Sequence, residues 1–306
     1  DLHSFPTRRS SDLVQRVFLM ASLDALTDIS MNAHGLRVQE LYGRPILNSF
    51  HGWWSIGAVC GGFIGSAARQ AGIPVWAQCV AATVVFGGMS LGAKTLLLPG
   101  LDHDPQAERS RKQRRRRIPT GTVVRLAALG LLGASAGLME DTGSTWGAIY
   151  LDRQFEVIPF VAGMAFVGLQ GAQLIGRFTG DALVSRIGPR FAVVQGGIIA
   201  FLGMGLSLIW PSPTTAILGF ACVGWGVATA IPSAMHAADE LPDINHGDGL
   251  MIVTWMMRIG FFAGPPLIGA LSEATDLRLA LWVVPAFAVV ILALSPSLGR
   301  SVGGRR

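Results

Sequence analysis

Long apolar stretches recur along almost the whole 306-residue chain, and they limit its fold more than any other feature. Each is near or above the roughly 20 residues that an α-helix needs to cross a bilayer, and each holds few charges. Nine such stretches cover residues 14–38, 46–69, 74–98, 122–150, 158–184, 190–210, 213–237, 248–271 and 279–297. Apolar residues make up 51% of the chain and charged residues 14%, a balance foreign to soluble domains. The sequence therefore predicts an all-α polytopic membrane protein with about nine transmembrane helices.

Basic residues are divided unequally between the loops on the two sides of these stretches. Fourteen Lys and Arg residues fall in one set of alternate loops and three in the other. Because basic residues are retained on the cytoplasmic side, this predicts a cytoplasmic C-terminus and an outer start of the first span. Residues 109–117, RSRKQRRRR, supply seven of the fourteen and have the charge to attract anionic lipids. Nucleic acid is not expected as a partner, because no aromatic residues interleave with the basic ones.

The basic loop also divides the chain into parts. Residues 14–98 hold three spans, residues 99–121 form the basic cytoplasmic loop, and residues 122–306 hold six spans and a short tail. Transporters made of two six-helix halves, each with two three-helix repeats, have this order once their first repeat is removed. We therefore expect the fold of such a transporter without its first three-helix repeat. Residues 1–13 are polar and similar to a translated sequencing adapter, so we expect a non-native leader there.

Several sequence blocks resemble one family of transporters. GRFTGDALVSRIGPR, residues 176–190, resembles the loop signature of the major facilitator superfamily, although Asp181 precedes Arg186 by five residues where the superfamily usually has them adjacent. The longer form GRFTGxxLxSR is similar to the fucose permease branch, as is LTDISMNAHG, residues 26–35. Three further blocks resemble less characterised bacterial permeases near that branch: GRPxxxxFHGWWSIG, EDTGSTWGAIYL and GPPLIGAL, residues 43–57, 140–151 and 264–271. The resemblance implies a transporter of a small polar solute, and the branch implies a sugar.

Charged residues inside a span cost about 2.5–3.5 kcal/mol each, so we treat them as functional candidates. Asp24, Asp28 and Asn32 recur at intervals of four residues and therefore share one helix face in the first predicted span. The resemblance places Asp28 where fucose permease has a carboxylate associated with proton coupling. We expect Asp28 to carry the proton or, alternatively, only to pair with a neighbouring helix. Asp24 and Asn32 are candidates for the wall of the substrate cavity.

A second acidic cluster lies in the fourth predicted span, where Glu140 and Asp141 begin the block EDTGSTW. At 1.5 Å per residue from Gly121, Glu140 is about 28 Å along this helix, nearer the outer face than the centre. Glu140 and Asp141 are therefore candidates for an outer vestibule of the cavity, or for a capping or interfacial role. Trp146 either stacks on a sugar ring or belongs to the aromatic belt at the membrane interface.

The remaining candidates include several basic residues. Arg258 lies within the eighth predicted span, where a guanidinium needs a carboxylate, a carbonyl or a charged group of the substrate. Four residues fit a cytoplasmic gate, in which a carboxylate and a guanidinium pair in one state and separate in the other: Arg177, Asp181, Arg186 and Arg190. His51, near the cytoplasmic entrance of the second predicted span, is either a neutral hydrogen-bonded residue or a proton relay.

No cofactor or metal is expected. The chain has no GxGxxG, HExxH or P-loop pattern, and its three cysteines show no metal-ligand spacing. We expect a monomeric secondary transporter of the inner membrane that moves a small polar solute by alternating access, with protons as the coupling ion. The alternatives are an exporter of drugs or metabolites with the same fold, a non-transporting sensor and an inert fragment. An enzyme is not expected, because no nucleophile lies with its base in a span.

Overall fold

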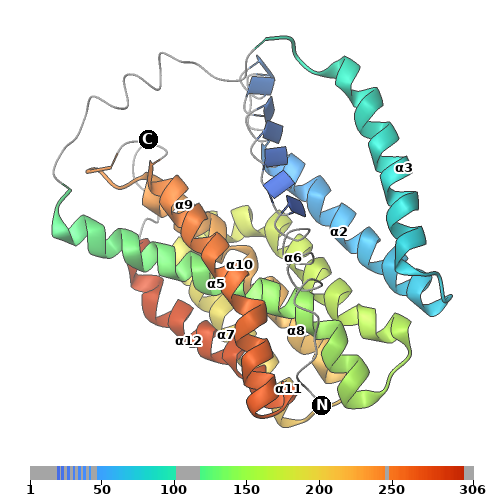
Figure 1. The fold of residues 1–306 in the computed structure, drawn as a ribbon. Helices are drawn as coiled ribbons and strands as arrows, with labels where there is room; N and C mark the ends of the chain where they lie inside the picture. The colour runs from blue at the N-terminus through green and yellow to red at the C-terminus, as the bar shows by residue number, and fades with distance from the viewer. Residues whose placement is uncertain are drawn as a thin grey trace, which may run out of the picture. The chain divides into compact units, whose positions relative to one another are not determined.

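The computed structural model describes residues 47–100, 118–244 and 248–299, together with pairs of residues between residues 19 and 42. All regular structure in these ranges is helical (Figure 1). The first helices are α2 (Leu47–Gln70), α3 (Val75–Ala93) and a short 3-10 helix, η1 (Lys94–Leu96). The others are α5 (Thr120–Phe155), α6 (Pro159–Ile187), α7 (Pro189–Ile209), α8 (Pro213–Ala228), α9 (Ala230–Asp239), α10 (Asp248–Ala274), α11 (Leu277–Ala280), α12 (Val283–Leu294) and the 3-10 helix η2 (Ser295–Leu298).

Seven segments of the described part are long and apolar enough to cross a membrane. They are Val75–Leu96, Thr120–Phe155, Pro159–Gly180, Pro189–Ile209, Pro213–Asp239, Asp248–Ala274 and Leu277–Leu298. These segments coincide with seven of the nine predicted spans and confirm an all-α fold with many candidate spans. The second predicted span forms the 24-residue helix α2. Within the first predicted span the structure describes only pairs of residues, and those are helical.

Two of the predicted spans are interrupted helices. The seventh divides at Thr229 into α8 and α9, because Pro232 has no N–H to donate to the carbonyl of Ala228. The ninth divides between α11 and α12, and Pro285 lies there in the first turn of α12. A first turn accommodates proline because its N–H groups have no partner within the helix. Hydropathy alone does not reveal either interruption. A proline lies just after each one, but proline alone does not dictate a break, since Pro265 and Pro266 lie inside the continuous helix α10.

Helix α5 is the centre of the bundle that α5 to α12 form. It packs against α6, α8, α9, α10 and α12, and its side chains Leu129, Leu132 and Met139 are fully buried. Helix α3 is the opposite case, because it has no buried residue although it is apolar over its whole length. An evenly apolar surface of this kind suits contact with lipid. Unlike α3, α5 has neighbouring helices on several sides, so polar groups on its buried faces are shielded by those helices.

Glycine lets two pairs of helices approach closely. A Cβ atom on Gly260 of α10 would lie 2.0 Å from the carbonyl oxygen of Ala134 in α5. A Cβ atom on Gly224 of α8 would lie 2.0 Å from the carbonyl oxygen of Leu169 in α6. Small residues at such contacts are typical of helix packing in membranes. These contacts hold α10 against α5 and α8 against α6, and so position the face on which the candidate site lies.

Arginine side chains close two helix ends. Arg278, in α11, donates from Nε to the carbonyl oxygen of Leu208 at 2.8 Å and from Nη2 to that of Ile209 at 3.3 Å. Arg125, in the first turns of α5, donates from Nε to the carbonyl oxygen of Ser297 at 2.8 Å. The last carbonyls of a helix have no partner within it, so these bonds satisfy acceptors that would otherwise need water.

The chain divides into two compact units. The first consists of residues 1–51 and 86–114, and within it Arg37 donates hydrogen bonds to the carbonyl oxygens of Pro99 and Gly100. The second consists of residues 52–85 and 115–306. The second unit contains the bundle and every residue of the candidate site described next.

Candidate functional site

Glu140 lies near the middle of the 36-residue helix α5, and it is only 6% exposed. Helix α5 continues to Phe155, beyond the end of the predicted span at residue 150. Glu140 therefore lies nearer the centre of the observed helix than the centre of the predicted span. The structure therefore places this carboxylate deep in the bundle. A carboxylate at such a depth requires a partner, since burying an unpaired charge is expensive.

The partner of Glu140 is Arg177 of α6. Its Nη2 atom lies 3.8 Å from Oε1 of Glu140, and the two side chains are 28% and 7% exposed. The same guanidinium donates from Nη1 to the hydroxyl of Ser55 in α2 at 2.8 Å. It also lies over the ring of Trp54, 5.6 Å from the ring centre, a cation–π arrangement. Arg177 thus connects α5 and α6 to the part of α2 that belongs to the second unit.

Two glutamines extend this group along α6. Gln170 donates from Nε2 to the hydroxyl of Ser144 at 3.4 Å, and Gln173 lies beside Glu140. Gln170 and Gln173 are 3% and 0% exposed. Because residues three and four apart share a helix face, α5 and α6 meet along matching polar rows. We call this group the polar cluster, and its members are Ser55, Glu140, Ser144, Gln170, Gln173 and Arg177.

Several polar atoms of the cluster have no hydrogen-bond partner among the described residues. They are Oε2 of Glu140, Oε1 of Gln170, and both Oε1 and Nε2 of Gln173. A buried polar atom without a partner costs about 1–3 kcal/mol, and most such atoms in proteins do find one. The cluster therefore has unused capacity to bind water or a polar solute in the interior of an apolar bundle.

The other two candidates of the block EDTGSTW face other parts of the bundle. Asp141 is half-buried, and its Oδ2 atom accepts a hydrogen bond from the hydroxyl of Thr145 at 3.5 Å. Trp146 is half-buried and packs on the bundle core, and a Cβ atom on Gly269 of α10 would lie 3.6 Å from its ring. Its Nε1 atom is buried without a partner among the described residues. Of this block, the structure brings only Glu140 and Ser144 into the polar cluster.

The four residues predicted to form a cytoplasmic gate lie on α6 and at the start of α7. Arg177 lies well inside α6 and belongs to the polar cluster. Arg186 lies in the last turn of α6 and Arg190 in the first turn of α7, and neither forms an ion pair within the described ranges. Asp181 belongs to α6, but its side chain is not described. The cytoplasmic gate stays a prediction. For Arg177 the structure indicates another role, as the partner of Glu140 in the polar cluster.

Other candidates fall outside the description. Asp24, Asp28 and Asn32 are not among the described residues, so the polar face predicted for the first span stays a prediction. His51 belongs to α2, but its side chain is not described. Arg258 is half-buried within α10. No group of three or more His, Cys, Asp or Glu residues in the described part could hold a metal ion.

The sequence-based prediction did not include four members of the polar cluster: Gln170, Gln173, Ser55 and Ser144. A signal for the glutamines was present, because Gln170, Gln173 and Arg177 recur at intervals of three and four residues inside the apolar segment VGLQGAQLIGR. That spacing places all three on one helix face. Ser55 gave no such signal, since its role depends on contact with α6, which is distant in the sequence.

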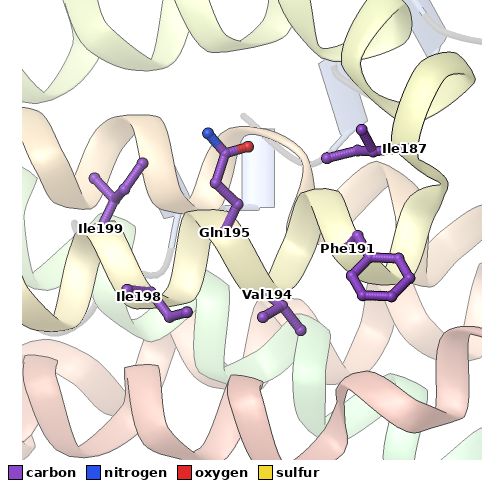
Figure 2. A pocket seen from close by; sticks show the side chains of 6 residues that line it. All are labelled: Ile187, Phe191, Val194, Gln195, Ile198 and Ile199. Carbon is purple, nitrogen blue, oxygen red and sulfur yellow. The ribbon is translucent and has the colours of Figure 1, made fainter.

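Two hollows lie away from the polar cluster. Figure 2 shows a groove along α7 that is lined by one polar side chain and five apolar ones: Gln195, Ile187, Phe191, Val194, Ile198 and Ile199. A pocket of about 190 Å³ lies where α2 and α5 end and α6 begins, and its lining includes Ser66, Arg69 and Asp152. The groove is almost wholly apolar, as a surface in contact with lipid would be. The lining of the pocket includes one basic residue, Arg69, and one acidic residue, Asp152, but no residue of the polar cluster.

Comparisons with known proteins agree with this architecture. Residues 129–300 match the family model described as Major Facilitator Superfamily. The chain is 29% identical to the uncharacterised transporter y4wD of Sinorhizobium fredii over 285 residues, which are 92% of the chain and 73% of that protein. It is 25% identical to an uncharacterised MFS-type transporter of Yersinia pestis, covering 90% of the chain and 69% of the relative. It is 27% identical to the membrane protein MosC of Rhizobium meliloti, covering 94% and 69%. No solved structure matches the chain significantly.

Proposed function

We propose that this chain, which belongs to the major facilitator superfamily of membrane transporters, moves a small polar solute across the bacterial inner membrane by alternating access. The observation that carries the proposal is the polar cluster itself. Glu140, Gln170 and Gln173 are nearly or fully buried within an apolar bundle, yet four of their polar atoms lack partners among the described residues. Natural proteins keep such groups mainly where function needs them.

The location of the cluster supports a role in binding a transported solute. In transporters built from helix repeats, substrates bind near the middle of the membrane at the interface of the repeats. Glu140 lies near the middle of α5, and Arg177 joins α5 and α6 to α2, which belongs to the preceding group of predicted spans. A solute held at this junction would contact helices that move relative to one another when the site opens to either side.

Alternating access requires the contacts between α2 and α6 to break and form again. These helices meet through small residues, since a Cβ atom on Gly163 of α6 would lie 1.8 Å from Oγ of Ser66 in α2. At the end of α2, Oε1 of Gln70 accepts a hydrogen bond from the backbone N–H of Phe160 at 3.3 Å. Apolar side chains lie at the same interface, since a Cβ atom on Gly62 of α2 would lie 2.7 Å from the ring of Phe166 in α6. An interface of small residues between α2 and α6 is compatible with movement of these helices between two states.

We further propose that protons supply the energy, that Asp28 carries them and that the solute is a sugar. The support for Asp28 and for a sugar is the resemblance of LTDISMNAHG and GRFTGxxLxSR to the fucose permease branch. A carboxylate inside a span is the kind of group that loads and unloads a proton. The chain also lacks the glycine-rich sequence that binds nucleotide phosphates, which favours an ion gradient over ATP.

The test is uptake of radiolabelled sugars by proteoliposomes that contain the purified chain and carry an imposed proton gradient. We expect accumulation that collapses with a protonophore and is lost in Asp28→Asn. The matched control is Asp24→Asn, one helical turn away on the same predicted face, which as a cavity-wall candidate should weaken the apparent affinity for the sugar but leave its accumulation proton-driven. Unchanged accumulation in Asp28→Asn would refute the assignment of Asp28. Absence of proton-linked uptake for every sugar would refute both the coupling ion and the substrate class.

A further inference from the structure

The charges in the polar cluster are already balanced. Glu140 contributes the single negative charge and Arg177 the single positive charge, and the two are paired. The other contacts of the Arg177 guanidinium are the hydroxyl of Ser55 and the ring of Trp54. Arg177 is therefore occupied on three sides. A solute carboxylate or phosphate entering the cluster would have to displace Glu140 from Arg177 and would then lie beside a second carboxylate.

The atoms that still lack partners are mostly acceptors. While Glu140 is ionised and paired with Arg177, its Oε2 atom can accept hydrogen bonds but cannot donate one. The amides of Gln170 and Gln173 offer oxygen or nitrogen atoms according to how each amide is turned. If the Gln173 amide turns its nitrogen toward Oε2 of Glu140, beside which it lies, its own oxygen and that of Gln170 still need donors. Hydroxyl groups suit this mixture, because a hydroxyl donates one hydrogen bond and also accepts from an amide.

We propose that the polar cluster binds an uncharged or cationic solute rich in hydrogen-bond donors and rejects anionic solutes. This inference rests on the proposed transport function and specifies the chemistry of its solute. A hydroxyl or ammonium group reaches Oε2 of Glu140, and neighbouring hydroxyls pair with the amides of Gln170 and Gln173. A solute carboxylate in the same place adds a second negative charge and supplies no donor to the unpaired oxygens of Glu140, Gln170 and Gln173.

Three probes with the same hydroxylated carbon chain separate these cases. D-glucitol ends in a hydroxymethyl group, D-glucamine in an ammonium group and D-gluconate in a carboxylate. Binding is measured as the rise in the unfolding temperature of the purified, detergent-solubilised chain during titration with each probe. We expect glucitol and glucamine to bind at least about tenfold more tightly than gluconate, because each unpaired buried polar group weakens binding by that order. Gluconate binding as tightly as either other probe would overturn the proposal. No binding of glucitol or glucamine would also overturn it, because the unpaired atoms would then be satisfied by water alone.

A pair of glutamine variants separates ligand binding from simple stability. Gln173→Leu removes two buried polar atoms that lack partners, so we expect the ligand-free protein to unfold at an equal or higher temperature. The same variant should lose at least about tenfold in affinity for glucitol. Gln195→Leu is the matched control, because Gln195 also has a buried oxygen without a described partner but lies in the groove along α7. It should bind glucitol as the wild type does. Unchanged glucitol binding in Gln173→Leu, or equal loss in both variants, would contradict the assignment.

Exchange measurements distinguish failure of this inference from failure of the transport proposal. Proteoliposomes loaded with unlabelled probe are tested for entry of the same probe in labelled form. Exchange of gluconate without exchange of glucitol or glucamine would support transport and overturn the inference about solute chemistry. Tight binding of glucitol with no exchange of any probe would support the inference and count against transport.

Discussion

Removing either partner of the buried ion pair should destabilise the bundle by unequal amounts. Replacing Arg177 by Met leaves the carboxylate of Glu140 buried without its cation. Breaking a buried pair in this way costs about 3–5 kcal/mol. The 3.8 Å separation and the 28% exposure of the Arg177 side chain argue for the lower end of that range. We therefore expect Arg177→Met to lower the free energy of unfolding by about 3 kcal/mol.

Glu140→Gln should cost less, because Arg177 keeps its hydrogen bond to Ser55 and its partial exposure. We expect a loss of about 1 kcal/mol for this variant. The double variant contains no buried charge at this position, and its loss should be about 2 kcal/mol. The two substitutions would then be non-additive by about 2 kcal/mol, as contacting charged residues are.

The free energies are obtained from equilibrium unfolding of the purified chain in mixed micelles titrated with sodium dodecyl sulfate. Cys222, which is half-buried, reports unfolding through its reaction with a thiol dye after Cys60 and Cys79 have been replaced by Ala. Additivity of the two single variants within about 0.5 kcal/mol would refute the reasoning, because residues without interaction add within that margin. A greater loss for Glu140→Gln than for Arg177→Met would refute it as well.

Two further predictions concern the packing that positions the cluster. Gly260→Ala should lower the free energy of unfolding by at least about 2 kcal/mol, because the new Cβ would lie 2.0 Å from a backbone oxygen of α5. Gly171→Ala on α6, where nothing lies within 4 Å, should leave stability equal or raise it by up to about 1 kcal/mol, and a similar loss in both variants would contradict the packing argument. Arg278→Met should cost about 1–3 kcal/mol in the same titration, since it removes two bonds to the last carbonyls of α7. No measurable loss would show that water satisfies those carbonyls equally well.

Much of the fold was predictable from hydropathy, because the bilayer dictates the length and apolar character of each span. The observed bounds of α6, α7 and α10 differ from the predicted spans by only a few residues. The breaks at Thr229 and before α12 were not predicted, since the averaged hydropathy of a segment does not register where a proline interrupts hydrogen bonding.

The candidate site was less predictable than the fold. Glu140 stood out because a carboxylate in an apolar span is expensive. Its pairing with Arg177 was not foreseen, since Arg177 belongs to a motif whose resemblance indicated a gate at the helix end. The true neighbour depends on how α5 and α6 are aligned, which follows from their packing through Gly143 and Gly147 against Leu169 and Ala165. The alignment of two packed helices along each other cannot be predicted from the sequence of either helix alone.

The most direct test asks whether the polar cluster becomes accessible to water from both sides of the membrane. Gln170→Cys and Ser207→Cys are prepared in a chain without its three natural cysteines, because the two residues are equally buried at 3% and 2% exposure. Each is treated with a membrane-impermeant methanethiosulfonate in right-side-out and in inverted vesicles. The account predicts that Gln170→Cys reacts in both preparations and that Ser207→Cys, which packs against Gly219 of α8, reacts in neither. If Gln170→Cys is as unreactive as Ser207→Cys from both sides, the cluster is static packing and the alternating-access account is wrong.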